Sequence, residues 1–144
     1  MTDAVVASHR PRTPPVAADV IIELVDRPDR PIVLIERRYP PLGFAIPGGF
    51  VELGESVEQA AVREALEETS LVVRLKHLLG VYSDPSRDPR GHTVGIVYIG
   101  EATGEPRAMD DAQAVRITDP RHPPSLVFDH ALIISDYCRY RFKV

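Results

Sequence analysis

The stretch that decides the fold of this chain runs from Gly48 to Ser70 and reads GGFVELGESVEQAAVREALEETS. Its second part has small and apolar residues at helical spacing. Ser56 followed by Gln59 is the signature of a capping box, so a helix is expected over residues 56–69. Its first part holds three glycines within seven residues, which indicates a tight loop or a close approach of the backbone to another group. We therefore expect a glycine-rich loop that leads directly into a helix.

Three glutamates gather on one side of this expected helix. Glu64, Glu67 and Glu68 stand at i, i+3 and i+4, so at about 100° per residue they share an arc of roughly 100°. The residues expected on the opposite half, facing a sheet, are Val57, Ala61, Val62, Ala65 and Leu66. One interpretation of the acidic side is an ordinary solvated surface, on which Arg63 pairs with Glu67.

A second interpretation is a site for divalent cations. Glu64 and Glu68 form a like-charge pair that mildly destabilises a helix without a counter-ion, and Glu52 and Glu55 add two carboxylates just before the helix. Hard oxygen ligands in this number suit Mg²⁺ or Mn²⁺. A zinc site would require histidine or cysteine, and this stretch contains neither.

The rest of the chain indicates an α/β layered domain. Strands are expected over residues 16–25, 31–38, 71–82, 92–101 and 113–118, with a short apolar segment at 44–47, a loop at 83–91 and a second helix at 125–142. Ser125 is the expected cap of that second helix. Strands and helices in this order predict a mixed β-sheet and not a doubly wound parallel one.

The composition bounds the organisation and the class of partner. The 144 residues fit one domain, which we expect over residues 16–144 after a flexible N-terminal segment 1–15. A net charge of −4 gives no sign of binding to nucleic acid. Cys138 is the single cysteine, so no disulfide forms within the chain, which fits a reducing cytoplasm. We find no secretory signal and no apolar run of the ~18–20 residues that cross a bilayer, so no membrane partner is expected.

Within this stretch the spacing resembles a known motif. Gly49, five residues, Glu55, seven residues and then Arg63 to Leu71 (REALEETSL) are similar to the Nudix box, G-x5-E-x7-R-E-U-x-E-E-x-G-U, in which U is a bulky aliphatic residue. The order of strands and the C-terminal helix also resemble the Nudix α/β/α sandwich with its mixed β-sheet. The sequence departs from the box at two positions, because Ser70 replaces its glycine and Ala65 is smaller than the usual aliphatic residue. We expect a slightly shifted helix end from Ser70, not a lost site.

The resemblance implies roles for individual residues. Glu64, Glu67 and Glu68 would bind Mg²⁺, with Mn²⁺ as an alternative, and the carbonyl of Gly48 would be a further ligand. Glu55 would pair with Arg63 and hold the loop, with Gly49, against the helix. Glu67 or Glu68 would also accept the proton of the attacking water. Some relatives use a late glutamate outside the box, and the matching position here is Ala114, with Asp110 and Asp111 nearby.

Other segments resemble the ADP-ribose pyrophosphatase branch of the family. They are residues 36–52, residues 80–100, the DDA at 110–112 and the FDHA at 128–131. The candidate substrate-binding residues that follow from them are Arg37, Arg38, Phe44, Glu52, Arg87, Arg90 and His92. The arginines suit phosphate because the guanidinium is a bidentate donor, and Phe44, Tyr39 or Tyr82 could stack on adenine. Each of these residues also has a plain structural interpretation, as surface charge, polar loop or core.

The expected activity is a Mg²⁺-dependent cleavage of the diphosphate in a small-molecule nucleotide, most simply ADP-ribose to AMP and ribose 5-phosphate. An alternative is a nucleoside triphosphate pyrophosphohydrolase that removes damaged nucleotides. A third is a non-catalytic nucleotide sensor, against which the complete set of box glutamates argues. A homodimer is expected from the resemblance.

Overall fold

The computed structural model describes residues 10–143 of the chain. The first nine residues of the segment expected to be flexible therefore lie outside the described part. The elements, in chain order, are β1 (Val16–Leu24), β2 (Ile32–Arg37), β3 (Phe44–Ala45), β4 (Gly48–Phe50), α2 (Val57–Thr69), β5 (Arg74–Tyr82), β6 (Val94–Ala102), β7 (Ala112–Thr118) and α3 (His130–Phe142). The strands expected from the sequence are all present, with ends that differ by at most three residues.

A mixed sheet of seven strands forms the centre of the structure. Its main path runs β3-β2-β1-β6-β5, while β4 pairs with β1 and β7 pairs with β2. β1 and β6 are parallel along their whole length, whereas β1 and β2 form an antiparallel hairpin. The mixed α/β sheet expected from the sequence is thus confirmed.

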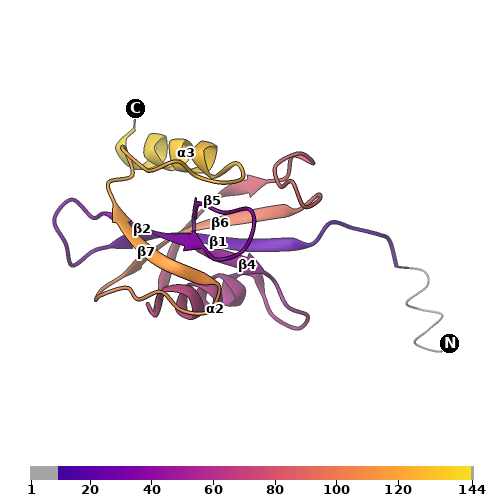
Figure 1. Cartoon of the computed structure of the whole chain (residues 1–144), viewed down its shortest axis with the longest axis horizontal. Helices are drawn as coiled ribbons and strands as arrows, with labels where there is room; N and C mark the ends of the chain where they lie inside the picture. The colour runs from indigo at the N-terminus through magenta and orange to yellow at the C-terminus, as the bar shows by residue number, and fades with distance from the viewer. Residues whose placement is uncertain (1–9, 144) are drawn as a thin grey trace.

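The sheet is covered by one helix on each face, α3 above and α2 below in Figure 1. Alternation along β1 sends Ala18, Val20 and Ile22 into the core under α2 and Ile21 into the core under α3. The same alternation turns Asp19 and Glu23 toward α3, although both are polar and buried. These two carboxylates mark two separate regions of the molecule.

The helix α2 packs with a face that only partly matches the expected one: Ala61 and Ala65 are buried as expected, and Val57 packs against the same core. Its buried residues are Ala60, Ala61, Ala65, Glu68 and Thr69, while Leu66 is 47% exposed. Small side chains let the helix lie close to the backbone of β1 and β4, and this rotation carries Glu68 inward. Leu66 was expected to face the sheet, and this was wrong. Glu68 was expected on the side opposite the core, and this was also wrong.

Both ends of α2 follow the local sequence. Ser56 is the N-cap, its side chain accepts the Gln59 N–H, and the Gln59 side chain accepts the Ser56 N–H, which completes the capping box. At the other end Ser70 adopts a left-handed conformation, with φ of 65°. Its hydroxyl lies 2.7 Å from the Met109 sulfur. The helix thus ends where the box requires, with serine in the place of glycine, so the slightly shifted end expected from Ser70 was wrong.

The helix α3 begins at His130, five residues after the expected cap Ser125. Leu126 instead forms an isolated bridge with Phe44, and Phe128 is left-handed with φ of 57°, a conformation that no helix continues through. Val127, which was expected on the helix, packs against the small core of Ile35, Ala45 and Ala112. Asp129 occupies the N-cap position without a side-chain capping bond. The expected start at Ser125 was wrong because residues 126–128 pack along the sheet and do not adopt helical backbone conformations.

Candidate active site

The three glutamates of α2 differ in how far they are withdrawn from solvent. Glu68 is 6% exposed and its Oε2 accepts the Gly48 N–H at 3.4 Å. The Glu64 side chain is 16% exposed, and that of Glu67 is 44% exposed. Burial raises the pKa of both Glu64 and Glu68, and the mutual repulsion of the two carboxylates raises that of Glu68 further. Two neighbouring carboxylates are therefore held where negative charge is unfavourable unless a cation neutralises it.

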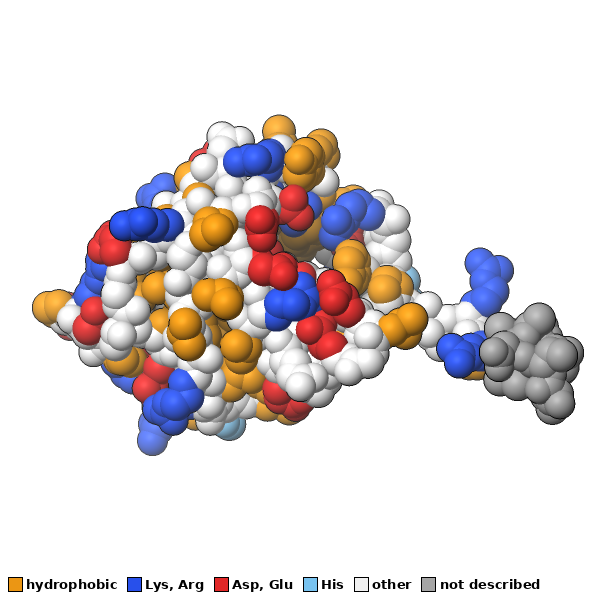
Figure 2. Space-filling model, turned by 90° about the horizontal axis from the view of Figure 1, so that it is seen from below, with side chains coloured by type: hydrophobic (Ala, Val, Ile, Leu, Met, Phe, Trp, Pro, Cys, Tyr) orange, Lys and Arg blue, Asp and Glu red, His pale blue; other side chains and the backbone are white. Residues whose placement is uncertain are grey.

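Arg63 ties the glycine-rich loop to the helix. Its Nε and Nη2 each donate to Glu55 at 2.8 Å, and Nη2 also donates to the Phe50 carbonyl at 3.1 Å. Its Nη1 donates to Glu64 at 2.9 Å and to Glu67 at 3.2 Å. The bond to Arg63 lowers the pKa of Glu55 to about 2. Figure 2 shows the resulting group of acidic side chains around a basic one on the α2 side of the molecule.

The two glycines of the loop leave no room for a side chain. A Cβ at Gly48 would fall onto the Asp19 carboxylate and 2.5 Å from the Ala18 carbonyl oxygen. A Cβ at Gly49 would lie 2.5 Å from Glu64 Oε1. Gly48 thus permits the contact between β4 and β1, and Gly49 permits the contact between the loop and the glutamate side chains.

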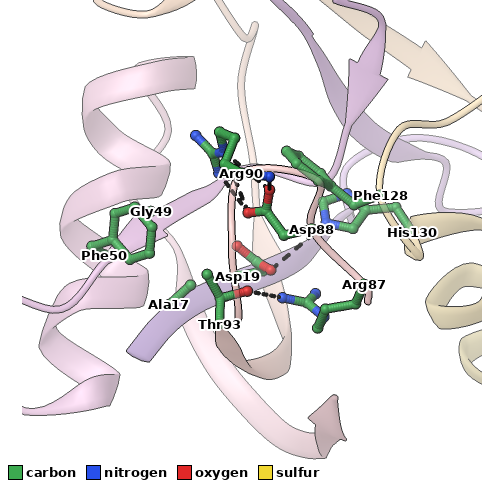
Figure 3. A pocket seen from close by; sticks show the side chains of 10 residues that line it. All are labelled: Ala17, Asp19, Gly49, Phe50, Arg87, Asp88, Arg90, Thr93, Phe128 and His130. Atoms are coloured by element: carbon green, nitrogen blue, oxygen red, sulfur yellow. Dashed lines mark hydrogen bonds and ion pairs between the residues drawn. The ribbon is translucent and has the colours of Figure 1, made fainter. Parts of the chain in front are cut away.

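Asp19 is a residue of this site that the sequence analysis did not single out. Its carboxylate is buried beside Gly48, and burial raises its pKa to about 7. Oδ2 lies 3.9 Å from His130 Nε2, as Figure 3 shows. His130 Nδ1 accepts the Ile46 N–H at 3.0 Å, which leaves the ring proton on Nε2, toward Asp19. The strand VAADVIIEL holds two acidic residues, Asp19 and Glu23, among apolar ones, and this pattern was the signal that could have drawn attention to both.

The loop between β5 and β6 closes one side of the site with two arginines. Arg87, whose side chain is 5% exposed, donates to Asp129 at 2.8 and 3.0 Å and to Thr93 at 2.9 Å. Its guanidinium is therefore engaged in holding the loop to the start of α3. Arg90 is bound by Asp88 at 2.8 Å, and its side chain is 47% exposed.

Two cationic side chains contact the ring of Phe128. The guanidinium carbons of Arg37 and Arg90 stand 5.2 and 5.3 Å from the centre of its ring. Burial is the main cause that lowers the pKa of Arg37, and Glu68 and Asp111 act against it. A cavity of about 60 Å³ opens here, and Asp19, Gly49, Arg90, Phe128 and His130 are among the residues that line it (Figure 3).

The other candidate residues lie around this cavity or outside it. Arg38 and His92 are exposed, and His92 Nε2 lies 3.1 Å from the Ser83 carbonyl oxygen. Phe44 lies under Arg116, 5.2 Å from its guanidinium carbon. Glu52 is 70% exposed and 3.8 Å from Arg63. Of the tyrosines considered for adenine, Tyr82 donates to Asp136 on α3 and Tyr39 is 57% exposed.

The region of the late acidic residue adjoins the end of α2. The Met109 N–H donates to the Glu68 carbonyl at 3.1 Å, so Asp110 and Asp111 follow directly after this contact. Asp111 acts on Arg37 electrostatically, as Glu68 does. Ala114 pairs with Glu36 across β7 and β2. Of the two aspartates, Asp111 is the one that the structure connects electrostatically to the site.

The donor set fits a hard divalent cation by its chemistry. Glu64 and Glu68, both with a raised pKa, lie against the backbone of a glycine-rich turn, and Glu67 lies on the same helix, bound to Arg63. Among residues 10–143, no three acidic, histidine or cysteine side chains converge closely enough to hold a metal ion in their present orientations. Arg63 binds one oxygen each of Glu64 and Glu67, which leaves the second oxygen of each carboxylate as the candidate ligand atom.

Comparison with known proteins places the chain in a family. The family model of the NUDIX domain matches residues 13–136. The ADP-ribose pyrophosphatase of Methanocaldococcus jannaschii is 51% identical over 131 residues, which cover 89% of this chain and 75% of that protein. The chain therefore belongs to the NUDIX family, as the resemblance of its glycine–glutamate motif predicted.

Solved structures agree on the fold. A MutT NUDIX hydrolase from Burkholderia pseudomallei superposes with a TM-score of 0.74 at 28% identity, covering 87% of this chain and 98% of that one. The NUDIX domain of Shewanella oneidensis NrtR, crystallised with ADP ribose, gives 0.76 at 24% identity, with 99% of both chains covered. The latter likeness shows the fold alone.

In the described part of the chain no helix combines the length and the apolar character that a bilayer crossing requires.

Proposed function

We propose that this protein hydrolyses the diphosphate bond of ADP-ribose to give AMP and ribose 5-phosphate. The observation that carries the proposal is the 51% identity with the ADP-ribose pyrophosphatase of M. jannaschii over most of both chains. The site described above supplies the chemistry, because it gathers carboxylates beside a glycine turn and places exposed cationic groups next to them. We further propose Mg²⁺ as the metal, the cytoplasm as the location and a homodimer as the assembly.

The residues of the site divide the work. Glu64, Glu67 and Glu68, with the Gly48 carbonyl, would hold the divalent cation, which when bound neutralises the diphosphate and activates water. Glu67 or Glu68 would accept the proton of the attacking water. Arg63 and Glu55 keep the loop against α2, with Gly49 at the contact. These roles rest on the position of each residue in the motif and on the contacts described above.

Substrate would bind across the mouth of the small cavity, since about 60 Å³ is far below the volume of a nucleotide. Arg90 offers an exposed guanidinium and Arg37 lies beside the same phenyl ring, so both suit the diphosphate. Phe128 is better placed than Phe44 to meet a flat ring at this mouth. Arg38, Glu52 and His92 would lie at the edge of the substrate, while Arg87 positions the loop.

Product analysis tests the proposal. The protein is incubated with Mg²⁺ and ADP-ribose, ADP-glucose, NADH or a deoxynucleoside triphosphate, and the products are separated by chromatography. AMP and ribose 5-phosphate are expected from ADP-ribose, whereas a preference for the triphosphate with release of pyrophosphate would support the alternative activity. Glu68→Gln should lower the rate roughly 100-fold or more. The matched control is Glu58→Gln, because Glu58 lies on the same helix but bonds to Tyr98 at 2.9 Å. Equal rates for the wild type and Glu68→Gln on every substrate would refute the proposal.

A further inference from the structure

A second pocket lies at the end of the molecule opposite the glycine-rich loop. It is found where the turn between β1 and β2 meets the C-terminal end of α3, on the left of Figure 1. Its volume is about 320 Å³, within the range of small-molecule sites. The residues that line it are Glu23, Arg30, Lys76, Tyr140, Arg141 and Lys143.

The floor of this pocket is a buried carboxylate that is fully engaged. Glu23 is 2% exposed and receives the Tyr137 hydroxyl at 2.5 Å, the Lys76 ammonium at 2.8 Å and Arg30 at 3.5 Å. With three hydrogen-bond donors, the carboxylate of Glu23 has its acceptor oxygens occupied. Two of these donors, the side chains of Lys76 and Arg30, line the pocket. Glu23 therefore organises the cations around it.

The wall formed by Lys76 depends on an irregularity of β5. The pairing of β5 with β6 shifts between Leu75 and His77, so Lys76 is the extra residue of a bulge. Bulges redirect side chains at the edges of sheets, and this one directs the amine to Glu23. Lys76 also lies 3.4 Å from Glu101.

The opposite wall depends on a second irregularity. Asp29 and Arg30 are consecutive residues with positive φ, of 65° and 43°, which is a costly conformation for non-glycine residues. Their carbonyl oxygens accept hydrogen bonds from Arg141 at 2.6 and 2.8 Å. The end of α3 thus holds the turn in this shape and brings Arg30 to the pocket.

The pocket carries positive charge on an acidic protein. Its lining holds four cations against one carboxylate, a net +3, while the whole chain carries −4. Within residues 10–143, neither Arg141 nor Lys143 forms an ion pair with a carboxylate. Tyr140 adds an aromatic wall and stacks on His77, with ring centres 4.4 Å apart. A small anion with a flat ring matches this combination of charge and surface.

We propose that this pocket is a binding site for a phosphate monoester, with a nucleoside monophosphate as the preferred form. Arg30 and Lys143 bind the phosphate, since their side chains reach solvent, and the base lies against Tyr140. The site is separate from the acidic site, because Asp19 and Glu23 are four residues apart on β1, about 13 Å. It does not depend on the substrate proposed above.

The test is a titration followed by backbone amide shifts in NMR, in the presence of EDTA. Three probes are added in turn: inorganic phosphate, AMP and adenosine. Phosphate and AMP should shift the amides of the β1–β2 turn, of Lys76 and of Lys143, and AMP should also shift those around Tyr140. Adenosine should leave the β1–β2 turn unchanged. Shifts from AMP only around Gly48 and Phe128, or shifts of the pocket by adenosine equal to those by AMP, would overturn the proposal.

Variants give a second measurement. Arg30→Gln combined with Lys143→Gln should weaken phosphate and AMP about tenfold or more, because charge-assisted hydrogen bonds are lost. Arg139→Gln is the matched control, since Arg139 lies on the same helix outside the pocket and pairs with Asp136. Wild-type affinity in the double variant, or an equal loss in the control, would show that the pocket does not bind the anion. Thermal unfolding of each variant verifies that it is folded.

Discussion

At the scale of single residues, Gly48 and Gly49 are adjacent but are constrained by different neighbours. Gly48 faces the main chain of β1, including the Ala18 carbonyl at 2.5 Å from a virtual Cβ, as well as the Asp19 side chain. Gly49 faces only the end of the Glu64 side chain. A main chain in a central strand cannot move aside, whereas a glutamate side chain can rotate.

Alanine at the two glycines should therefore give different results. Gly48→Ala is expected to lower the free energy of unfolding by about 3 kcal/mol, and Gly49→Ala by about 1 kcal/mol, because overpacking against rigid backbone is the more costly case. Both should impair hydrolysis, Gly49→Ala by displacing Glu64. Urea denaturation measures the free energy of unfolding of each variant, and the ADP-ribose assay measures its rate of hydrolysis. Adding Asp19→Ala should not restore Gly48→Ala, since the clash with Ala18 remains; equal stability of the two single variants would contradict this account.

Single residues also show where sequence reasoning stops. The pairing of Glu55 with Arg63 was implied by the resemblance to the box, and the structure contains it. The same resemblance placed the end of the helix at Ser70. Asp19 was not predicted, since its importance arises only when β4 and His130, which are distant in the chain, are brought against it. Arg87 and Arg90 are arginines of the same loop, yet Arg87 is bound by Asp129 and Arg90 by Asp88. The roles of such residues are distinguished by their burial and by their partners in the folded structure. A local sequence pattern does not carry this information.

At the scale of elements, the loop over residues 50–55 depends on α2 for its shape. Arg63 reaches Glu55, the Phe50 carbonyl and two helix glutamates at the same time. This requires the five donors and planar fork of a guanidinium, which an ammonium group lacks. The loop should therefore be more sensitive to the shape of this side chain than to its charge.

Arg63→Lys tests that dependence while keeping the charge. Amides of residues 50–55 are expected to exchange with deuterium about tenfold faster, because the loop opens locally without global unfolding. Hydrogen exchange followed by mass spectrometry measures this. Arg74→Lys is the control, since Arg74 makes its ion pair with Glu101 outside the loop. Unchanged exchange in Arg63→Lys would show that the loop holds its shape without the fork.

Elements were predictable to different degrees for a physical reason. α2 carries its own start and end signals, so its bounds were correct. Its buried face was correct for Ala61 and Ala65 but wrong for Leu66 and Glu68, because the packing of small residues against β4 decides the rotation. The start of α3 was placed too early, since the apolar spacing of residues 127–138 is helical while Phe128 adopts a left-handed conformation imposed by the sheet. Helical spacing of apolar residues indicates which residues are buried. Because a non-helical backbone can bury the same residues, the spacing alone does not fix where a helix begins.

At the scale of the whole molecule, β1 places one buried carboxylate under the start of α3 and another under its second half. Asp19 meets His130 at its first residue, and Glu23 meets Tyr137 two turns later. The first belongs to the acidic site and the second organises the basic pocket. One strand thus connects two polar regions of opposite charge through an apolar centre at Ile21. Sequence reasoning predicted the layers and the acidic region, but not the second region, which depends on a bulge and a turn.

The contact of α3 with the sheet through His130 should make the stability of the whole molecule depend on pH. Burial lowers the pKa of His130 to about 4, from 6.5 in the unfolded chain, while Asp129 acts against this shift and Arg87 with it. Between those values the unfolded state binds the additional proton at this residue, so the contribution of His130 to the free energy of unfolding should fall by at most about 3 kcal/mol as pH decreases from about 6.5 to 4. Asp19, whose pKa is raised to about 7, acts in the opposite direction over the same range, so the test is the difference between the wild type and a variant without the imidazole. His130→Asn keeps an acceptor near the Ile46 N–H and removes the titration, so its stability should decline less over this window. Urea denaturation at several pH values measures both slopes, with the exposed His122→Asn as control. If His130→Asn lost stability as steeply as the wild type, the buried imidazole would not be the group responsible, and the acid sensitivity of the fold would have to come from its carboxylates.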